Sequence, residues 1–549
     1  MQSIIKVASS LEKIFADQPF RGSDYDRASV LRGEVFSLQL ACWCDTYCDV
    51  AIEVNSSVKD ITLREVGLVP CELPAQDRVT DNVLRRTSGL YPDPLVPWSG
   101  RIRLVPDQWR SVWVTVRIPE NEAPGTTLLR FKAIFKGTRG VGGESVSETT
   151  FILDINEAVL PEQKLIHTEW FHADCICHKA DCPCWSERHW ELLECYFKNF
   201  ASHGINMLLT PLWTPPLDTA PGKERPTVQL LDISKNQELY TFDFSRLERW
   251  IDLALTCGVK YFEFSHPFTQ WGAEHCPKII VRVDGEDKML FGWHSDSLGA
   301  EYKDFLGQLL PQLMEFIRRK GLEKECYFHI SDEPGMDHIE RYRGCSEVIS
   351  ELVGECNIID ALSNIEFYRQ GLVRTPIPGN NHIEDFVSDN VQPLWTYYCC
   401  SQVNAVPNRF FNFPSCRNRV MGVLMYLYDV RGFLQWGYNF WYSRFSENLD
   451  IDPWRVTDAD RSFPSGDPFM VYPGKDCTPV DSIRHEVFFE AIQDMRALQL
   501  HEELVGRDAT IALIHQGIDY RLSMDKYPCT AEWLLDLRER LNRAIACCK

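Results

Sequence analysis

The sequence contains no uninterrupted apolar stretch approaching the roughly 18 residues that a membrane-spanning helix needs. Its first segment, MQSIIKVASSLEKIFADQPF, is broken by Lys6, Glu12 and Lys13, so it also lacks the hydrophobic region of a signal peptide. These absences predict no membrane partner and a cytoplasmic location. The 21 cysteines are then expected as reduced thiols rather than as a disulfide framework.

Basic residues are in the minority, with 57 Lys and Arg against 78 Asp and Glu and a formal net charge of −21. No run of Lys and Arg interleaved with aromatic residues follows the pattern of a phosphate-binding surface, which argues against nucleic acid as a partner. Aromatic residues reach 12%, with 16 Trp. Because Trp and Tyr stack their apolar faces on sugar rings, this composition favours a carbohydrate partner.

The first 160 residues lack helical stretches of a length comparable to their strand patterns. Alternating β-branched and aromatic segments separated by turn residues occupy 34–44, 49–54, 110–119, 126–136 and 148–155. This pattern predicts an N-terminal β-sandwich domain over residues 1–160. The segment NEAVLPEQ (156–163) is too short for a flexible tether, so we expect the sandwich to pack against the domain that follows.

Beyond residue 160, short apolar runs alternate with amphipathic helix patterns such as 186–204, 243–258 and 299–321. Eight such units predict a catalytic (β/α)8 TIM barrel over residues 161–549, in which the fifth to seventh units carry the poorest helix signals. The eight expected strands lie within 166–172, 205–211, 259–266, 326–334, 357–364, 383–389, 393–400 and 432–441.

Polar and aromatic residues gather at the expected strand ends. Barrel enzymes place their active sites at the C-terminal ends of the strands, so these side chains are predicted to share one rim and to bind substrate. They are Trp170, His172, Asp174, His266, Gln270, Trp271, Tyr397, Tyr398, Trp436, Asn439 and Trp441.

The fourth strand ends in the adjacent carboxylates Asp332 and Glu333, within YFHISDEPG. A turn-rich loop is the plain interpretation. Glycoside hydrolysis offers a chemical interpretation. Neighbouring residues cannot easily flank a scissile bond, however, and the seventh strand, PLWTYYCC, carries no acid that could act as nucleophile. A 2-acetamido group on the sugar can replace that nucleophile by attacking the anomeric carbon to form an oxazolinium.

Under this hypothesis Asp332 holds the acetamide N–H, and Glu333 protonates the glycosidic oxygen and later deprotonates water. Repulsion between the two is expected to raise the pKa of one of them, which keeps the acid protonated near neutral pH.

Three alternatives remain open. A conventional two-carboxylate glycosidase would take its second acid from Glu366 or Asp385. A metal-dependent hydrolase would use ligands from His172, Asp174, His266 and His275, which form no familiar motif. A non-catalytic carbohydrate-binding protein would have no need of the intact Asp332–Glu333 pair.

The chain resembles glycoside hydrolase family 123 in the segments WFHADC (170–175), TPLWTPPLDT (210–219), SHPFTQWGAEHCPKI (265–279), HISDEP (329–334) and GFLQWGYNFWYS (432–443). The resemblance implies an N-terminal β-sandwich, a catalytic barrel and retaining β-N-acetylgalactosaminidase activity. It also implies that Asp332 and Glu333 are the catalytic pair, and the aromatic rim holds the sugar. No cofactor is expected.

One segment departs from that pattern. DCICHKADCPCWSE places Cys175, Cys177, Cys182 and Cys184 with His178 just beyond the first strand. Such residues satisfy tetrahedral zinc, but the spacing is C-x-C rather than the usual C-x-x-C. We therefore expect free thiols in a loop and no metal.

Overall fold

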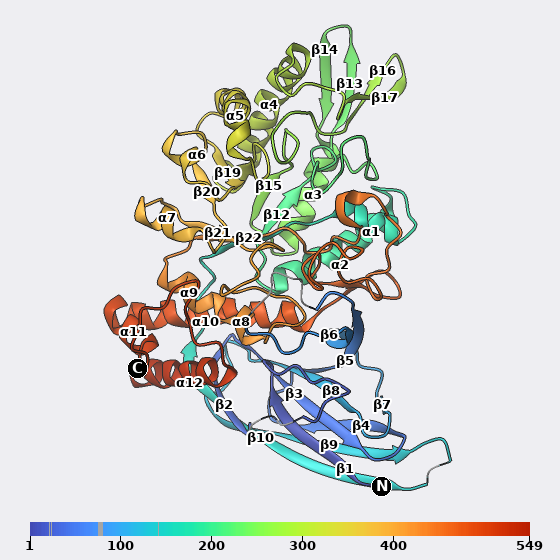
Figure 1. The fold of residues 1–549 in the computed structure, drawn as a ribbon, viewed down its shortest axis with the longest axis vertical. Coiled ribbons are helices and arrows are strands. Elements are labelled where there is room, and N and C mark those ends of the chain that lie inside the picture. Colours follow the sequence, from blue (N-terminus) through green and yellow to red (C-terminus); the bar gives the residue numbers. More distant parts are fainter. Residues whose placement is uncertain (21, 23–24, 75–80, 141, 549) are drawn as a thin grey trace.

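The computed structural model describes residues 1–20, 22, 25–74, 81–140 and 142–548. Its N-terminal region consists of two five-stranded sheets (Figure 1). The first has the order β1-β3-β8-β5-β6, formed by β1 (Ser3–Ser9), β3 (Val35–Cys44), β8 (Trp109–Arg117), β5 (Ile61–Cys71) and β6 (Gly89–Pro97). The second has the order β2-β10-β9-β4-β7, formed by β2 (Arg27–Arg32), β10 (Glu144–Val159), β9 (Gly125–Gly137), β4 (Cys48–Asn55) and β7 (Ile102–Leu104).

Strict alternation of apolar side chains builds the core of this region. Along β9, Leu129, Phe131, Ala133 and Phe135 are buried while the residues between them face outward. This period of two residues places one face of each strand in a shared apolar cluster. All five predicted strands are present, which confirms the β-rich N-terminal region.

Eight parallel strands form the barrel at the centre of the molecule (Figure 1). Neighbouring strands follow the order β20-β19-β18-β15-β12-β11-β22-β21, and a parallel bridge between Gly379 and Tyr397 spans the gap between the two outermost strands. In chain order the strands are β11 (Ile166–Glu169), β12 (Met207–Thr210), β15 (Tyr261–Phe264), β18 (Cys326–Phe328), β19 (Asn357–Ala361), β20 (Thr375–Ile377), β21 (Trp395–Tyr397) and β22 (Gly432–Gln435).

Helices separate the barrel strands. The three predicted long helices are present as α2, α3 and α4, and α4 ends at Gly321, whose φ of 69° suits a residue without Cβ. The helices are α1 (Ala173–Lys179), α2 (Glu187–Ser202), α3 (Ser245–Thr256), α4 (Ala300–Lys320), α5 (Ile339–Val353), α6 (Glu366–Arg369), α7 (Ile383–Ser388), α8 (Cys416–Arg419), α9 (Met421–Leu427), α10 (Ile483–Val505), α11 (Arg507–Ile514) and α12 (Ala531–Cys547), with short 3₁₀ turns η1 (Met336–His338) and η2 (Arg444–Ser446).

The sixth strand was predicted in the wrong place. Residues 383–389, expected as a strand, begin with helix α7, because Ile383 and Phe386 are buried three residues apart on one helical face. The actual sixth strand is β20, only three residues long and containing Pro376. So short a run carries no periodicity, and its proline argued against a strand.

Two hairpins inserted into the barrel loops combine into a separate four-stranded sheet, which was not predicted. One hairpin follows β12 and the other follows β15, and they meet through parallel pairing of Ser234 with Arg282. The sheet comprises β13 (Asp232–Asn236), β14 (Leu239–Asp243), β16 (Ile279–Val283) and β17 (Glu286–Phe291), and a small ladder near the C-terminal helices comprises β23 (Tyr472–Pro473) and β24 (Pro479–Val480).

The N-terminal region packs against the C-terminal part of the chain through buried ion pairs. Glu34 bonds Arg538 on α12 at 2.6 Å, and Asp93 bonds Arg484 on α10 at 2.8 Å. Helices α10 and α12 lie between the two sheets and the barrel in Figure 1. The expected packing of the two regions is therefore present, while a domain boundary at residue 160 stays a prediction.

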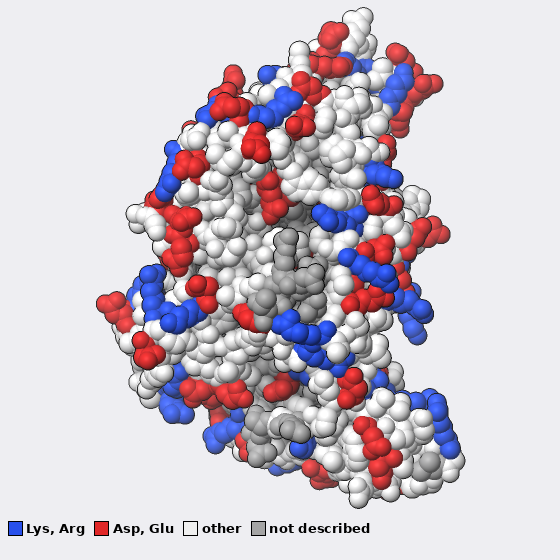
Figure 2. Space-filling view, in the orientation of Figure 1, with Lys and Arg blue, Asp and Glu red and all other residues white. Residues whose placement is uncertain are grey.

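No helix in the described part of the chain is both long enough and apolar enough to cross a bilayer. On the face shown in Figure 2, acidic and basic side chains are interspersed. The described residues on that face do not form a continuous basic area. The cytoplasmic location stays a prediction.

Candidate active site

A pocket, here called the inner pocket, lies over the C-terminal ends of the barrel strands. Its wall comes from seven of the eight strand ends and from a loop that follows β22. The lining residues are Trp170, Leu217, Asp218, Gln270, Trp271, Asp332, Glu333, Ala361, Cys399, Cys400, Leu434, Trp436 and Phe463. The barrel thus brings the predicted catalytic pair together with part of the predicted aromatic rim.

Backbone hydrogen bonds fix Asp332 and Glu333 beyond the end of β18. The carbonyl of Asp332 accepts the N–H of Trp271 at 2.8 Å, and the N–H of Glu333 donates to the carbonyl of Ala361 at 3.0 Å. Glu333 has a φ of 45°, a left-handed conformation that is strained for a side chain of this size. This turn leaves Asp332 half-buried and Glu333 exposed, so adjacent acids meet different surroundings.

The side chain of Glu333 is held by Tyr397, whose hydroxyl donates to Oε1 at 2.5 Å. Tyr397 is the last residue of β21, on the far side of the pair from Trp271. One predicted rim residue therefore positions a predicted catalytic acid. The other carboxylate oxygen of Glu333 stays available to a ligand.

Electrostatics distinguish the two acids. Burial raises the pKa of Asp332 well above its usual range, and the neighbouring charge of Glu333 raises it further. The sequence hypothesis expected the raised pKa to serve the proton donor, Glu333. The raised pKa described here is that of Asp332, and the burial of this carboxyl is its main cause.

The buried His329 has the opposite effect and lowers the pKa of Asp332. His329 bonds Glu263 at 2.8 Å through Nε2 and Asp360 at 3.3 Å through Nδ1, and these two acids raise its pKa to about 9 despite the burial. His329 is therefore an imidazolium at neutral pH, and its charge favours the ionised form of Asp332. Burial therefore favours the protonated form of Asp332, whereas the positive charge of His329 favours its ionised form.

Four predicted contact residues line the inner pocket, namely Trp170, Gln270, Trp271 and Trp436. The indole N–H of Trp436 donates to Asp467 at 2.9 Å, which fixes the ring. Gln270 accepts the N–H of Asp218 at 2.6 Å, while its own buried amide nitrogen has no partner among the described residues. An unsatisfied donor on the pocket wall suits a substrate oxygen.

His172, Asp174 and Asn439 lie beneath the wall rather than on it. Asp174 forms a buried ion pair with Arg225 at 2.7 Å, and the same guanidinium donates to Nδ1 of His172 at 3.0 Å. The side-chain amide of Asn439 accepts the backbone N–H of His172 and donates to the backbone carbonyl of the same residue. These residues shape the loop after β11, and a guanidinium beside His172 disfavours a metal there.

His266, Tyr398 and Trp441 are also absent from the pocket wall. His266 is buried and stacks on His329 with 4.0 Å between ring centroids. Tyr398 follows Tyr397 directly, so strand alternation turns it outward, where its hydroxyl donates to Asn418. Trp441 is buried, and its indole N–H donates to the carbonyl of Val471. Tyr398 and Trp441 are core residues, whereas both ring nitrogens of the buried His266 lack a hydrogen-bond partner among the described residues.

Asp218 is a pocket residue that sequence reasoning missed. Burial raises its pKa to about 6, and its Oδ2 accepts the N–H of Phe445 at 3.0 Å. Its position in TPLWTPPLDT, shortly after β12, was the available signal. It lies on the same wall as Asp332 and Glu333. The pocket therefore holds three carboxyl groups rather than two.

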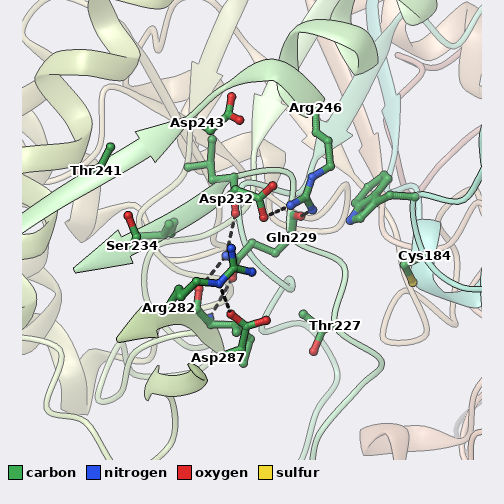
Figure 3. A pocket seen from close by; sticks show the side chains of 14 residues that line it. Cys184, Thr227, Gln229, Asp232, Ser234, Thr241, Asp243, Arg246, Arg282 and Asp287 are labelled. Carbon is green, nitrogen blue, oxygen red and sulfur yellow. Dashed lines mark hydrogen bonds and ion pairs between the residues drawn. The ribbon is translucent and has the colours of Figure 1, made fainter. Parts of the chain in front are cut away.

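A second pocket lies on the inserted four-stranded sheet, beside Cys184 (Figure 3). Four of its charged side chains pair with one another, Asp232 with Arg246 and Arg282 with Asp287, the latter at 3.0 Å, and Asp243 bonds Ser245 (Figure 3). None of the predicted site residues lines it. Because these charges are already neutralised, the inner pocket is the better candidate.

The cysteine-rich segment gathers Cys177, Cys184 and His189 close enough for one ion. Of the remaining candidates, Cys175 accepts the N–H of Trp441 and His178 bonds Asp450. His189 replaces His178 as the nearby imidazole. Its Nε2 bonds the carbonyl of Ala173 at 3.1 Å, and its Nδ1 accepts the N–H of Trp185 at 3.0 Å.

We expect purified protein to contain no stoichiometric zinc, because both ring nitrogens of His189 already have backbone partners. Elemental analysis, with thiol titration before and after chelation, measures this directly. One zinc per chain, released by a chelator with a fall in melting temperature, would contradict the expectation.

Replacing Trp436 with alanine is expected to raise KM or lower kcat by the equivalent of ~1 to 3 kcal/mol, the range of stacking and pocket-fit effects. Trp441→Ala is the matched control. It removes a buried indole, so we expect it to destabilise the fold by ~3 to 5 kcal/mol with unchanged kinetics per folded molecule. Steady-state kinetics combined with thermal denaturation separate the two, and the opposite pattern would exchange their roles.

A known protein family and a solved structure are similar to this chain. The family described as "Glycoside hydrolase 123, catalytic domain" matches residues 170–501. A solved family 123 glycoside hydrolase from Clostridium perfringens, described in a study of glycolipid glycan hydrolysis, is similar with a TM-score of 0.73 and 14% identity over 99% of this chain and 98% of that chain. At that identity the likeness shows a shared fold.

Other similarities are partial. The PapD-like domain of human CEP192 matches 28% of this chain and 86% of its own, with 9% identity and a TM-score of 0.15. The E. coli chaperone DraB matches 29% of this chain and 58% of its own, with 8% identity and a TM-score of 0.16. A search of curated proteins gave no match. The family match spans the inner pocket and most of the chain, and the chain belongs to glycoside hydrolase family 123.

Proposed function

We propose that the protein is a retaining exo-glycosidase that releases β-linked N-acetylgalactosamine, or a related 2-acetamido sugar, by substrate-assisted catalysis. The observation that carries the proposal is the placement of adjacent acids at one strand end, with Asp332 half-buried and Glu333 exposed and bonded to Tyr397. Neighbouring residues in such different surroundings suit two roles on the same side of the sugar.

In the proposed reaction the carbonyl oxygen of the substrate's acetamide attacks the anomeric carbon while Glu333 gives its proton to the departing glycosidic oxygen. Asp332 accepts a hydrogen bond from the acetamide N–H, and the positive charge developing on that nitrogen favours ionised Asp332. Glu333 then removes a proton from water, which opens the oxazolinium at the anomeric carbon with net retention.

The two-carboxylate alternative has less support. Glu366 bonds Arg369 on α6 at 2.8 Å, and neither Glu366 nor Asp385 on α7 lines the inner pocket. Asp218 is the remaining candidate nucleophile. One of its carboxylate oxygens already accepts the backbone N–H of Phe445.

A metal-dependent reaction and a purely binding role are also weaker. Of the predicted ligands His172, Asp174, His266 and His275, only His266 belongs to one of the three groups of described residues close enough to hold an ion, together with His329 and Asp360. Both ring nitrogens of His329 already bond Glu263 and Asp360. A binding protein would not need the strained turn that presents Glu333.

The proposal is tested by a panel of p-nitrophenyl glycosides. We expect turnover of β-linked 2-acetamido sugars and none of plain β-galactoside. If these substrates are all inert while another glycoside reacts, substrate assistance is wrong for this protein.

We also infer that the barrel is of the (β/α)8 type with shortened helices in its fifth to seventh units, and that residues 1–160 and 161–549 are separate domains. Support comes from the eight parallel strands with intervening helices and from the end of β10 at Val159.

A further inference from the structure

Two cysteines from distant parts of the chain meet beside the C-terminal helices. Cys416 is the first residue of α8 and is 3% exposed. Its Sγ lies 3.8 Å from Sγ of Cys529, which is partly exposed and belongs to the segment between α11 and α12. Both residues are free thiols, although they are 113 positions apart in the sequence.

The contact has the geometry of a pair that can be joined covalently. A disulfide holds its sulfurs about 2.05 Å apart, so the two must approach one another by less than about 2 Å. Cys529 lies in irregular chain rather than in a helix, and a shift of that size leaves α8 and α12 intact. Neither cysteine belongs to any of the three groups of described residues that are close enough to hold an ion.

The surroundings of Cys529 favour the thiolate, which is the form of cysteine that reacts with oxidants. A hydrogen bond from Cys416 lowers the pKa of Cys529 despite its partial burial, and the guanidinium of Arg417 lowers it further. The same hydrogen bond raises the pKa of Cys416, and burial adds to this effect. The pair therefore combines a partly exposed thiolate with a buried, protonated partner.

We propose that Cys416 and Cys529 form a reversible disulfide when a peroxide reaches Cys529. The Cys529 thiolate attacks one peroxide oxygen, the O–O bond breaks, and a sulfenic acid forms while hydroxide leaves. Cys416 gives its proton to that hydroxide and attacks the sulfenic sulfur, so the S–S bond forms and the S–O bond breaks with loss of a second hydroxide. The two sulfurs together lose two electrons, and the peroxide is reduced to water and hydroxide.

The cross-link would tie the start of α12 to a well-anchored part of the barrel domain. On α8, the amide of Asn418 donates to the carbonyl of Arg484 at 3.0 Å. Helix α12 begins at Ala531, two residues beyond Cys529. Because the disulfide closes a long loop, it restricts the unfolded chain strongly and is expected to stabilise the folded protein. This inference is independent of the proposed function.

The test treats the reduced full-length protein with hydrogen peroxide, alkylates the remaining thiols and digests the protein with trypsin without reductant. Trypsin cleavage gives peptides 410–417 and 527–538, each of which contains one cysteine. We expect these two peptides to be recovered as a disulfide-linked pair that dithiothreitol separates. The melting temperature should rise by about 3 °C or more on oxidation and return on reduction.

Three variants make the test specific. Cys529→Ser should form no link and should melt at the same temperature with and without peroxide, and Cys416→Ser should accumulate a sulfenic acid on Cys529 that dimedone captures. Cys195→Ser is the matched control, because it removes an exposed thiol on α2 and should leave the cross-link unchanged. Melting temperatures of the reduced variants verify folding.

The proposal fails if Cys195 is oxidised while Cys416 and Cys529 both stay reduced. It also fails if the link joins either of them to a different cysteine, or if Cys529 in the unmodified protein is converted to the sulfinic acid without a disulfide.

Discussion

Glu333→Gln is expected to lower kcat on sugar-linked substrates by about 10² to 10⁴-fold, the usual contribution of general acid–base catalysis. The loss should shrink as the leaving group becomes more acidic, because a stable departing anion needs less protonation. Glutamine retains an Oε1 that can accept the Tyr397 hydrogen bond, so the fold should be unaffected. Measuring kcat across a series of aryl glycosides of increasing leaving-group acidity gives the dependence directly.

Glu366→Gln serves as the control, because it makes the same chemical change at an acid that is paired with Arg369 and lies outside the inner pocket. It should leave kinetics unchanged. If Glu333→Gln slows activated and natural substrates to the same extent, Glu333 is not the proton donor.

A thiazoline analogue of the sugar is expected to inhibit competitively and far more tightly than the parent sugar. It imitates the cyclised intermediate, and transition-state-like species bind about 10² to 10⁸ times better than substrates. Asp332→Asn should weaken this inhibition, since a neutral amide replaces the carboxylate that faces the positive nitrogen. Inhibition constants for both proteins, with melting temperatures to verify folding, provide the measurement.

The same mechanism predicts a steep loss of rate when the acetamide is replaced by trifluoroacetamide, because the electron-poor carbonyl is a weaker nucleophile. A two-carboxylate enzyme would be insensitive to this change and would form a covalent adduct with a 2-fluoro sugar. Such an adduct on Asp218, detected by mass spectrometry, would contradict substrate assistance and identify the nucleophile.

The parts of the fold that could be predicted are those with repeated periodicity. Strands β9 and β10 alternate over many residues, and α2 to α4 carry apolar positions on one face, so their patterns identify them. Strand β20 has three residues and a proline, and the parallel pairing of the two inserted hairpins joins segments far apart in the chain. Neither the short strand nor the hairpin pairing can be recognised from a local sequence pattern.

The candidate site shows the same division. Asp332 and Glu333 could be found because two acids at a strand end form a motif. Which aromatic residues face the pocket depends on strand alternation and on the path of the loop after β22, which places Trp436 on the wall and Trp441 in the core. A motif predicts which part of the chain forms the site, whereas the direction of each side chain depends on tertiary packing.

The ion pair between Glu34 and Arg538 joins residues 504 positions apart. During synthesis from the N-terminus, the strands around Glu34 leave the ribosome long before Arg538 exists. Burying the Glu34 carboxylate without this cation costs free energy. The first sheets therefore cannot reach their final stability until α12 has been made. Loss of the last few dozen residues should consequently expose the beginning of the chain to proteolysis, although the two are at opposite ends of the sequence.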